Sequence, residues 1–140
     1  MQAGPSMDPF QAVRDASGEP LLRYLARTLV DGSPHVGELI DEMVDDAVQY
    51  MELGVEQGLL TPTDAPRSRA AVLTLWQLGA MVLNDHVQRL VGADLTSDDP
   101  EALMPWMIAV IPVLAEGVID PDYYAQWRDA IRSQQSEHHE

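Results

Sequence analysis

Cysteine and lysine are both absent from the 140 residues of this chain. The lack of cysteine excludes disulfide scaffolds, thiolate zinc sites and thiol nucleophiles, and it fits a reducing cytoplasm. Basic charge is scarce as well, because eight arginines stand against 23 Asp and Glu, for a formal net charge of −15. Nucleic-acid binders neutralise phosphates with clustered Lys and Arg. We therefore expect these residues alone to bind DNA poorly.

Long apolar runs and export signals are missing too. No stretch reaches the ~18 consecutive apolar residues of a membrane span, and residues 1–9 lack the basic and apolar parts of a signal peptide. We expect a protein that is neither embedded in a membrane nor exported. With 46% hydrophobic residues the chain has enough material for a core, and its length fits one domain.

Strand-like alternation is absent over any useful length, whereas apolar residues recur at three- and four-residue steps. This spacing is typical of amphipathic helices, so the sequence predicts an all-α fold. The predicted helices cover residues 9–16, 19–30, 34–58, 65–91, 100–118 and 121–132. Pro105 and Pro112 lie inside the fifth of these helices, so we expect a kink or a break near each.

Two of the predicted helices, 65–91 and 100–118, are apolar on more than one face. In the first, Val72 and Ala80 lie on the side of Trp76, while Leu78 and Met81 lie on the opposite side. A small domain cannot cover two such helices by itself, and large exposed apolar patches usually mark a partner surface. We therefore predict a homodimer.

Signatures of catalysis are also missing. The chain has no G-x-S-x-G elbow, no phosphate-cradling glycine loop, no dinucleotide fingerprint and no H-E-x-x-H pair. We predict no catalytic residue, no metal site and no cofactor, and hence no enzyme. Most of the arginines, including Arg67 and Arg69, fall near helix ends where we expect solvent. Only Arg23 and Arg27 are candidates to point inward.

Methionine and aromatic residues occupy helix positions from which they would either line a ligand cavity or fill the core. Methionine adapts to irregular space, and tyrosine supplies a polar tip within an apolar wall. Both interpretations stay open for Tyr24, Met43, Tyr50, Met51, Trp76 and Met81.

Several short segments between Leu21 and Leu90 have a characteristic order and spacing. They are Leu22–Arg27, Gly32–Pro34, Asp41–Met43, Tyr50 followed by Gly54, Gly58, Leu60 and Pro62, Asp64–Arg67 with Ala70 and Ala71, and Trp76–Ala80. Together they resemble the C-terminal effector-binding and dimerisation domain of TetR-family transcriptional regulators. The resemblance covers about half of the chain closely and the rest by helix pattern only.

This resemblance implies a helical bundle whose two long helices pair with those of a second chain in a four-helix dimer interface. In the family, an N-terminal headpiece with a helix-turn-helix reads DNA, and nothing before Leu21 resembles that headpiece. We therefore expect DNA binding only through a headpiece missing from this chain. The expected organisation is an N-terminal segment with a short helix at 1–18, an effector-binding and dimerisation domain at 19–132 and a disordered tail at 133–140.

The resemblance further implies that a small, largely apolar effector enters a cavity among the helices and so controls DNA binding, as in a cytoplasmic repressor. The expected ligand-binding residues are Tyr24, Met43, Ala47, Tyr50 and Trp76. The expected dimer-interface residues are Leu78, Met81, Val82, Trp106, Val110, Ile111 and Leu114.

Two alternative functions stay open beside this expectation. A helical protein-interaction module would be monomeric alone and would have no internal cavity. A small all-α enzyme would need converging basic side chains in a cavity, which the expected positions of the arginines disfavour.

Overall fold

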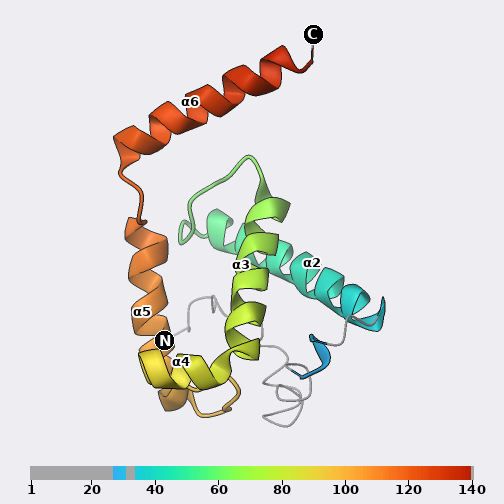
Figure 1. Cartoon of the computed structure of the whole chain (residues 1–140), viewed down its shortest axis with the longest axis vertical. Helices are drawn as coiled ribbons and strands as arrows, with labels where there is room; N and C mark the ends of the chain where they lie inside the picture. The colour runs from blue at the N-terminus through green and yellow to red at the C-terminus, as the bar shows by residue number, and fades with distance from the viewer. Residues whose placement is uncertain (1–26, 31–33, 140) are drawn as a thin grey trace. The chain divides into compact units, whose positions relative to one another are not determined.

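The computed structural model describes residues 27–30 and 34–139, and over these residues the chain is helical without a strand (Figure 1). The predicted all-α fold is confirmed. The helices are α2 Pro34–Glu56, α3 Pro66–Val82, α4 Asn84–Val91, α5 Pro100–Glu116 and α6 Pro121–Glu137. The predicted helix over 9–16 and nearly all of the one over 19–30 lie outside the described residues.

The chain divides into two compact units, Met1–Trp106 and Met107–Glu140. The first unit contains α2, α3, α4 and the start of α5, and the second contains the rest of α5 and all of α6. Within the described part of the chain, no single helix has both the length and the hydropathy to cross a bilayer, although the bent pair of α5 and α6 meets those criteria when counted together.

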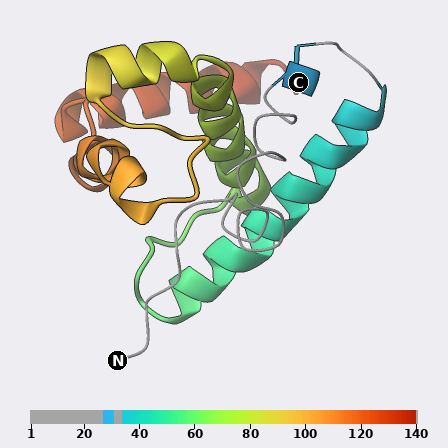
Figure 2. The ribbon, with the colours of Figure 1, turned by 90° about the horizontal axis from the view of Figure 1, so that it is seen from below.

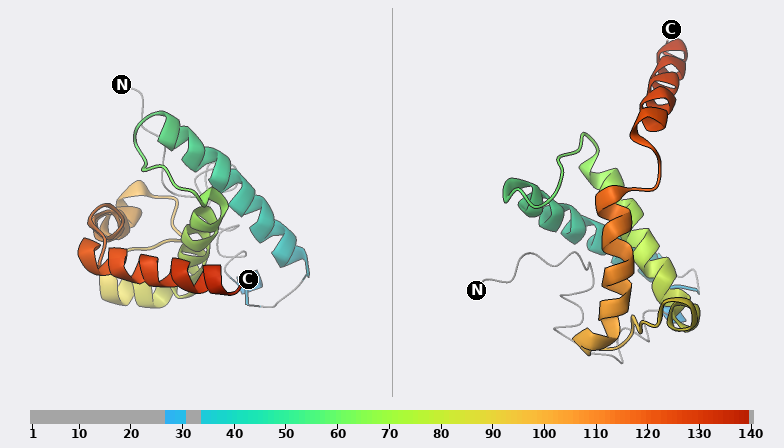
Figure 3. Two further views of the ribbon diagram at one scale, coloured as in Figure 1. Left: turned by 90° about the horizontal axis from the view of Figure 1, so that it is seen from above. Right: turned by 90° about the vertical axis from the view of Figure 1, so that its left-hand side faces the viewer.

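The core of the first unit forms where α2 crosses α3 (Figure 3). Helix α2 buries Val36, Met43, Val44, Ala47 and Gly54, at successive steps of seven, one, three and seven residues, which place them on one side of the helix. Met43 packs against Leu78 and Met81 of α3. The apolar stripe predicted for residues 34–58 is therefore the side of α2 that faces the core.

A second cluster of buried residues lies between α4 and the beginning of α5. Val87, Ala93 and Leu95 form its centre, and partly buried Leu103 and Trp106 pack against them. The indole Nε1 of Trp106 also donates a hydrogen bond of 3.2 Å to Oε1 of Gln77 on α3. These contacts fix the first half of α5 to the first unit.

The single helix predicted over residues 65–91 is wrong, because the structure breaks it at Leu83 into α3 and α4. Figure 2 shows α4 turning away from α3 at this point. The buried side chain of Asn84 begins the new helix and binds the loop that follows it, donating to Oδ1 of Asp94 at 2.8 Å and accepting from the Leu95 amide at 2.8 Å. Gly92, with a φ of 79°, ends α4 in the left-handed conformation that glycine favours.

The carboxyl of Asp94 is the acceptor at the centre of this loop, and its ionisation should matter for stability. Burial raises the pKa of Asp94, but hydrogen bonds from Asn84 and from the side chain and backbone of Thr96 outweigh it, so the pKa lies below its ordinary value. A carboxyl with a lowered folded-state pKa stabilises the fold above its unfolded pKa of about 3.9, and this contribution is lost as the pH falls through the folded pKa.

Acid should therefore destabilise the wild-type chain more than an Asp94→Asn variant. Urea unfolding at pH 7 and at pH 3 measures the loss of stability for each protein. We expect a smaller loss in Asp94→Asn, while Asp98→Asn, at an exposed position four residues later, behaves as wild type. An equal acid loss in Asp94→Asn and wild type would contradict the role given to this carboxyl.

The two C-terminal helices differ from the prediction in continuity and length. Helix α5 continues through Pro105 and Pro112, so neither proline breaks it. Helix α6 begins as predicted, with the Asp120 carboxylate accepting from the amides of Asp122 and Tyr123. It ends at Glu137, five residues beyond the predicted end, because residues 133–137 contain no Gly or Pro to terminate it. The part of the expected tail up to Glu137 is therefore helical.

Two glycines of α2, Gly37 near its start and Gly54 near its end, differ in how closely other atoms approach them. A Cβ at Gly54 would lie 2.8 Å from Cδ1 of Leu60, whereas a Cβ at Gly37 would meet nothing within 4 Å. Alanine gains up to about 1 kcal/mol over glycine inside a helix. We expect Gly37→Ala to raise the free energy of unfolding by about that amount, and Gly54→Ala to leave it unchanged or lower it. Equal stabilisation by both substitutions, measured by urea unfolding, would refute the close packing at Gly54.

Candidate functional site

The residues expected to bind the effector are only partly brought together. Met43 and Ala47 are buried on the side of α2 that faces the core, and Tyr50, one turn later, is half-buried with its hydroxyl fully covered. Trp76 is 62% exposed, so it does not share that environment. Tyr24 lies outside the described residues. The structure therefore places the three residues from α2 in a single region and separates Trp76 from them.

The α2–α3 pair contains polar groups that are covered but have no hydrogen-bond partner. They are the hydroxyl of Tyr50 on α2 and, on α3, the hydroxyl of Thr74 together with Nε and Nη2 of Arg69. Burial raises the pKa of Tyr50, which keeps its hydroxyl protonated. Buried polar groups in folded proteins nearly always have partners. The concentration of such groups on two packed helices makes this pair the candidate ligand site.

Sequence reasoning did not select Thr74, although a signal for it exists. Ala70, Thr74, Leu78 and Met81 are the buried residues of α3, and they follow one another at steps of four, four and three. A threonine on an otherwise apolar buried stripe is a polar group within the core. The helical period of the sequence could therefore have identified Thr74 as a candidate site residue.

The expectation that solvent surrounds both Arg67 and Arg69 is correct only for the first. Arg67 is exposed and forms an ion pair with Asp45 of α2, and the hydrogen bond and charge of Asp45 raise the pKa of Arg67. Arg69 is partly buried: Nη1 donates to the backbone carbonyl of Thr61, and its other two nitrogens named above are covered. A position near a helix end therefore does not decide which way an arginine points.

The residues expected at the dimer interface fall into two groups. Leu78 and Met81 are 3% and 1% exposed and pack with Met43 in the core of their own chain, which leaves them no surface for a second chain. The sequence assigns Met43 to the ligand site and these two residues to the dimer interface, because a helical wheel shows the sides of a helix but not what packs on each side. Trp106 is likewise engaged within the first unit.

The remaining members of that set keep more surface. Val82, Ile111 and Leu114 are exposed, and Val110 is half-buried. Neither α5 nor α6 buries any residue completely. In the unit Met107–Glu140, exposed apolar side chains recur at roughly helical spacing along the end of α5 and at its exit: Ile108, Ile111, Val113, Leu114, Val118 and Ile119. This unit therefore lacks a core of its own.

Helix α6 adds an aromatic surface that the sequence analysis did not assign to the interface. Tyr124 and Trp127 are both exposed, with ring centroids 6.5 Å apart, and the guanidinium of Arg128 lies 5.7 Å from the centre of the Tyr124 ring. The signal was present, since aromatic residues three apart lie on one side of a helix.

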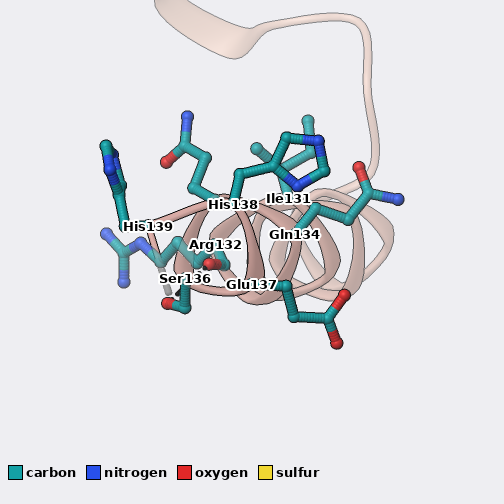
Figure 4. Close-up of a pocket in the computed structure, with 8 residues that line it drawn as sticks. Ile131, Arg132, Gln134, Ser136, Glu137, His138 and His139 are labelled. Atoms are coloured by element: carbon teal, nitrogen blue, oxygen red, sulfur yellow. Dashed lines mark hydrogen bonds between the residues drawn. The ribbon is translucent and has the colours of Figure 1, made fainter.

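A depression along the last turns of α6 carries little functional information. Residues 131, 132 and 134–139 line it, so it is formed by one helix, and Figure 4 shows their side chains spreading around that helix. Throughout the described part of the chain, this depression included, no three His, Asp or Glu side chains are placed to hold a metal ion.

Comparison with known proteins gives one family and one relative. Residues 17–119 match the model of a family described as "Tetracyclin repressor-like, C-terminal domain". The HTH-type transcriptional regulatory protein RaaS of Mycobacterium tuberculosis is 34% identical over 64 residues, which are 46% of this chain and 30% of that protein. No solved structure matches the chain significantly. The chain thus matches less than a third of its relative's length, and α6 lies beyond the family match.

Proposed function

Because the chain belongs to the family of tetracyclin repressor-like C-terminal domains, we propose that it is the ligand-sensing and dimerisation domain of a helix-turn-helix regulator that acts as a repressor. The family is one of transcriptional regulators. The observation that carries dimerisation is that the unit Met107–Glu140 exposes apolar side chains along α5 and α6 and buries none of them completely. Such a unit gains its stability by covering these side chains with a partner.

The partner in this proposal is a second copy of the chain. In the second unit, Ile111 and Leu114 supply exposed apolar surface and half-buried Val110 precedes them on α5, while exposed Val82 belongs to the first unit. Apolar surface removed from water contributes about 25 cal/mol per Å², so each of these side chains would add substantially to association. The aromatic side of α6 extends the same interface.

The effector in this proposal is a small, largely apolar molecule that binds between α2 and α3. Met43, Ala47 and Tyr50 provide apolar contacts and a polar tip, and Tyr24 is proposed to join them. An effector changes the arrangement of a dimer only if it binds one arrangement more tightly than the other. Since α2 and α3 pack on each other, a ligand between them would shift one helix relative to the other.

DNA binding is proposed to occur only through a headpiece outside these residues. A net charge of −15 repels the phosphate backbone, and the described residues expose few arginines. The cytoplasmic location proposed for the whole regulator follows from that role.

Thermal unfolding of the chain with a panel of small neutral apolar compounds tests the sensing role. A ligand present at about 100 times its dissociation constant stabilises the folded state by about 2.7 kcal/mol, which raises the unfolding midpoint by several degrees. We expect at least one apolar scaffold to do so and Met43→Ala to reduce the effect. If neither this panel nor a set of apolar carboxylates raises the midpoint, the sensing proposal fails and the interaction module is favoured.

A further inference from the structure

Arg69 on α3 has one guanidinium nitrogen in a hydrogen bond and two that are covered without a hydrogen-bond partner. Its Nη1 is fixed by the carbonyl of Thr61, in the connection between α2 and α3. The other two nitrogens, Nε and Nη2, form one edge of the planar guanidinium, and both are covered and without a hydrogen-bond partner. That edge carries two parallel N–H donors, the arrangement that binds the two oxygens of a carboxylate.

No acid among residues 27–30 and 34–139 forms a hydrogen bond with this edge. Within the described part of the chain, ion pairs join Arg67 with Asp45 and Arg128 with Asp129. One residue, Ser68, separates Arg67 from Arg69, and of the two arginines the exposed Arg67 is the one that forms an ion pair, with Asp45. Covering a charged group without a partner costs free energy, and that cost is recovered when an anion binds.

The other covered polar groups of this unit lie on the same helix pair. The Tyr50 hydroxyl on α2 and the Thr74 hydroxyl on α3 also have no partner, while the neighbouring buried side chains are apolar. Such surroundings suit a molecule that is apolar over most of its surface and carries a single polar head.

We propose that the effector of this domain is an apolar molecule with a carboxylate, which the Nε–Nη2 edge of Arg69 binds through two hydrogen bonds. This inference rests on the proposed sensing function and adds the chemical class of the ligand. It also separates the two arginines by role, since Arg67 serves an exposed ion pair with Asp45 while Arg69 recognises the ligand.

The test compares carboxylates with their methyl esters, which keep the apolar part and lose the charge. The probes are octanoate and 2-naphthoate, each with its methyl ester, and calorimetric titration gives the dissociation constants for the wild-type chain. We expect a carboxylate to bind about 10- to 100-fold more tightly than its ester, because charge-assisted hydrogen bonds contribute that much when water is excluded. Arg69→Gln should abolish the preference.

Two further variants make the result specific. Arg69→Lys keeps the charge but loses the paired donors, so it should retain only part of the preference. Arg67→Gln removes an arginine two positions away and should keep the whole preference. Circular dichroism of each variant checks that it folds, and the Arg69→Lys result remains available if Arg69→Gln does not fold.

The outcomes separate this inference from the proposed function. Binding of the esters as tightly as the acids, or an equal loss of preference in Arg67→Gln and Arg69→Gln, would overturn the carboxylate site and leave a sensor of neutral ligands. If neither the probes nor the neutral panel bind the wild-type chain, the sensing function fails and the inference fails with it.

Discussion

Replacing Ile111 by aspartate should convert the dimer of this chain into monomers. Ile111 is 45% exposed on α5, in the unit that has no fully buried residue, and the proposed interface covers it. Burying an aliphatic side chain of this size contributes about 1.5–3 kcal/mol, and a carboxylate there would also lose its hydration. The dissociation constant of the dimer should therefore rise by at least about 100-fold, which sedimentation equilibrium over a range of concentrations measures.

Leu53→Asp is the matched control for this experiment. Leu53 is 46% exposed on α2, so the substitution introduces the same charge at an equally exposed apolar position outside the proposed interface. We expect Leu53→Asp to dimerise like wild type. If Ile111→Asp remains a dimer, or if both variants dissociate alike, the interface does not include this side of α5.

Replacing Asn84 by alanine should lower the free energy of unfolding by about 2.5–6 kcal/mol, the largest stability effect we expect from one side chain. The variant removes the acceptor of the buried Leu95 amide and a donor to the Asp94 carboxylate, each at 2.8 Å. Losing the partner of a buried donor costs about 1–3 kcal/mol, and hydrogen bonds to charged groups contribute about 1.5–3 kcal/mol. Urea unfolding followed by circular dichroism measures the sum.

Asp85→Asn provides the comparison at the next position of the same helix. Asp85 is exposed in the first turn of α4, where its charge interacts favourably with the helix dipole by at most about 1 kcal/mol. We expect this control to cost clearly less than Asn84→Ala. Similar small losses in both variants would show that the bonds of Asn84 do not hold the break between α3 and α4.

The helices themselves follow from local sequence, whereas their breaks depend on distant contacts. The apolar period of residues 34–58 predicts α2 because one side of that helix is buried along its length. The period also continues from α3 into α4, so it gives no sign of the break at Leu83. That break depends on Asn84 bonding to Asp94 and Leu95, ten and eleven residues later, which no helical pattern encodes.

The candidate site was predictable for its apolar part and not for its charged part. Met43 and Ala47 fall on the buried side of α2 that the wheel identifies. Arg69 lies in the first turn of α3, three residues after Pro66, a position typical of exposed charge. Its covered edge depends on how the connection between α2 and α3 folds. Trp76 shows the converse, because a large aromatic residue on an apolar stripe is exposed in this chain.

Native mass spectrometry of the purified chain would show whether it is a ligand-binding dimer. It reports the number of chains and any retained small molecule in one spectrum. We expect a species containing two copies of the 15.5 kDa chain, with a bound molecule that is lost on activation and whose mass fits an apolar acid. A bare monomer at micromolar concentration would contradict this expectation and would favour a module whose apolar helices bind a different protein.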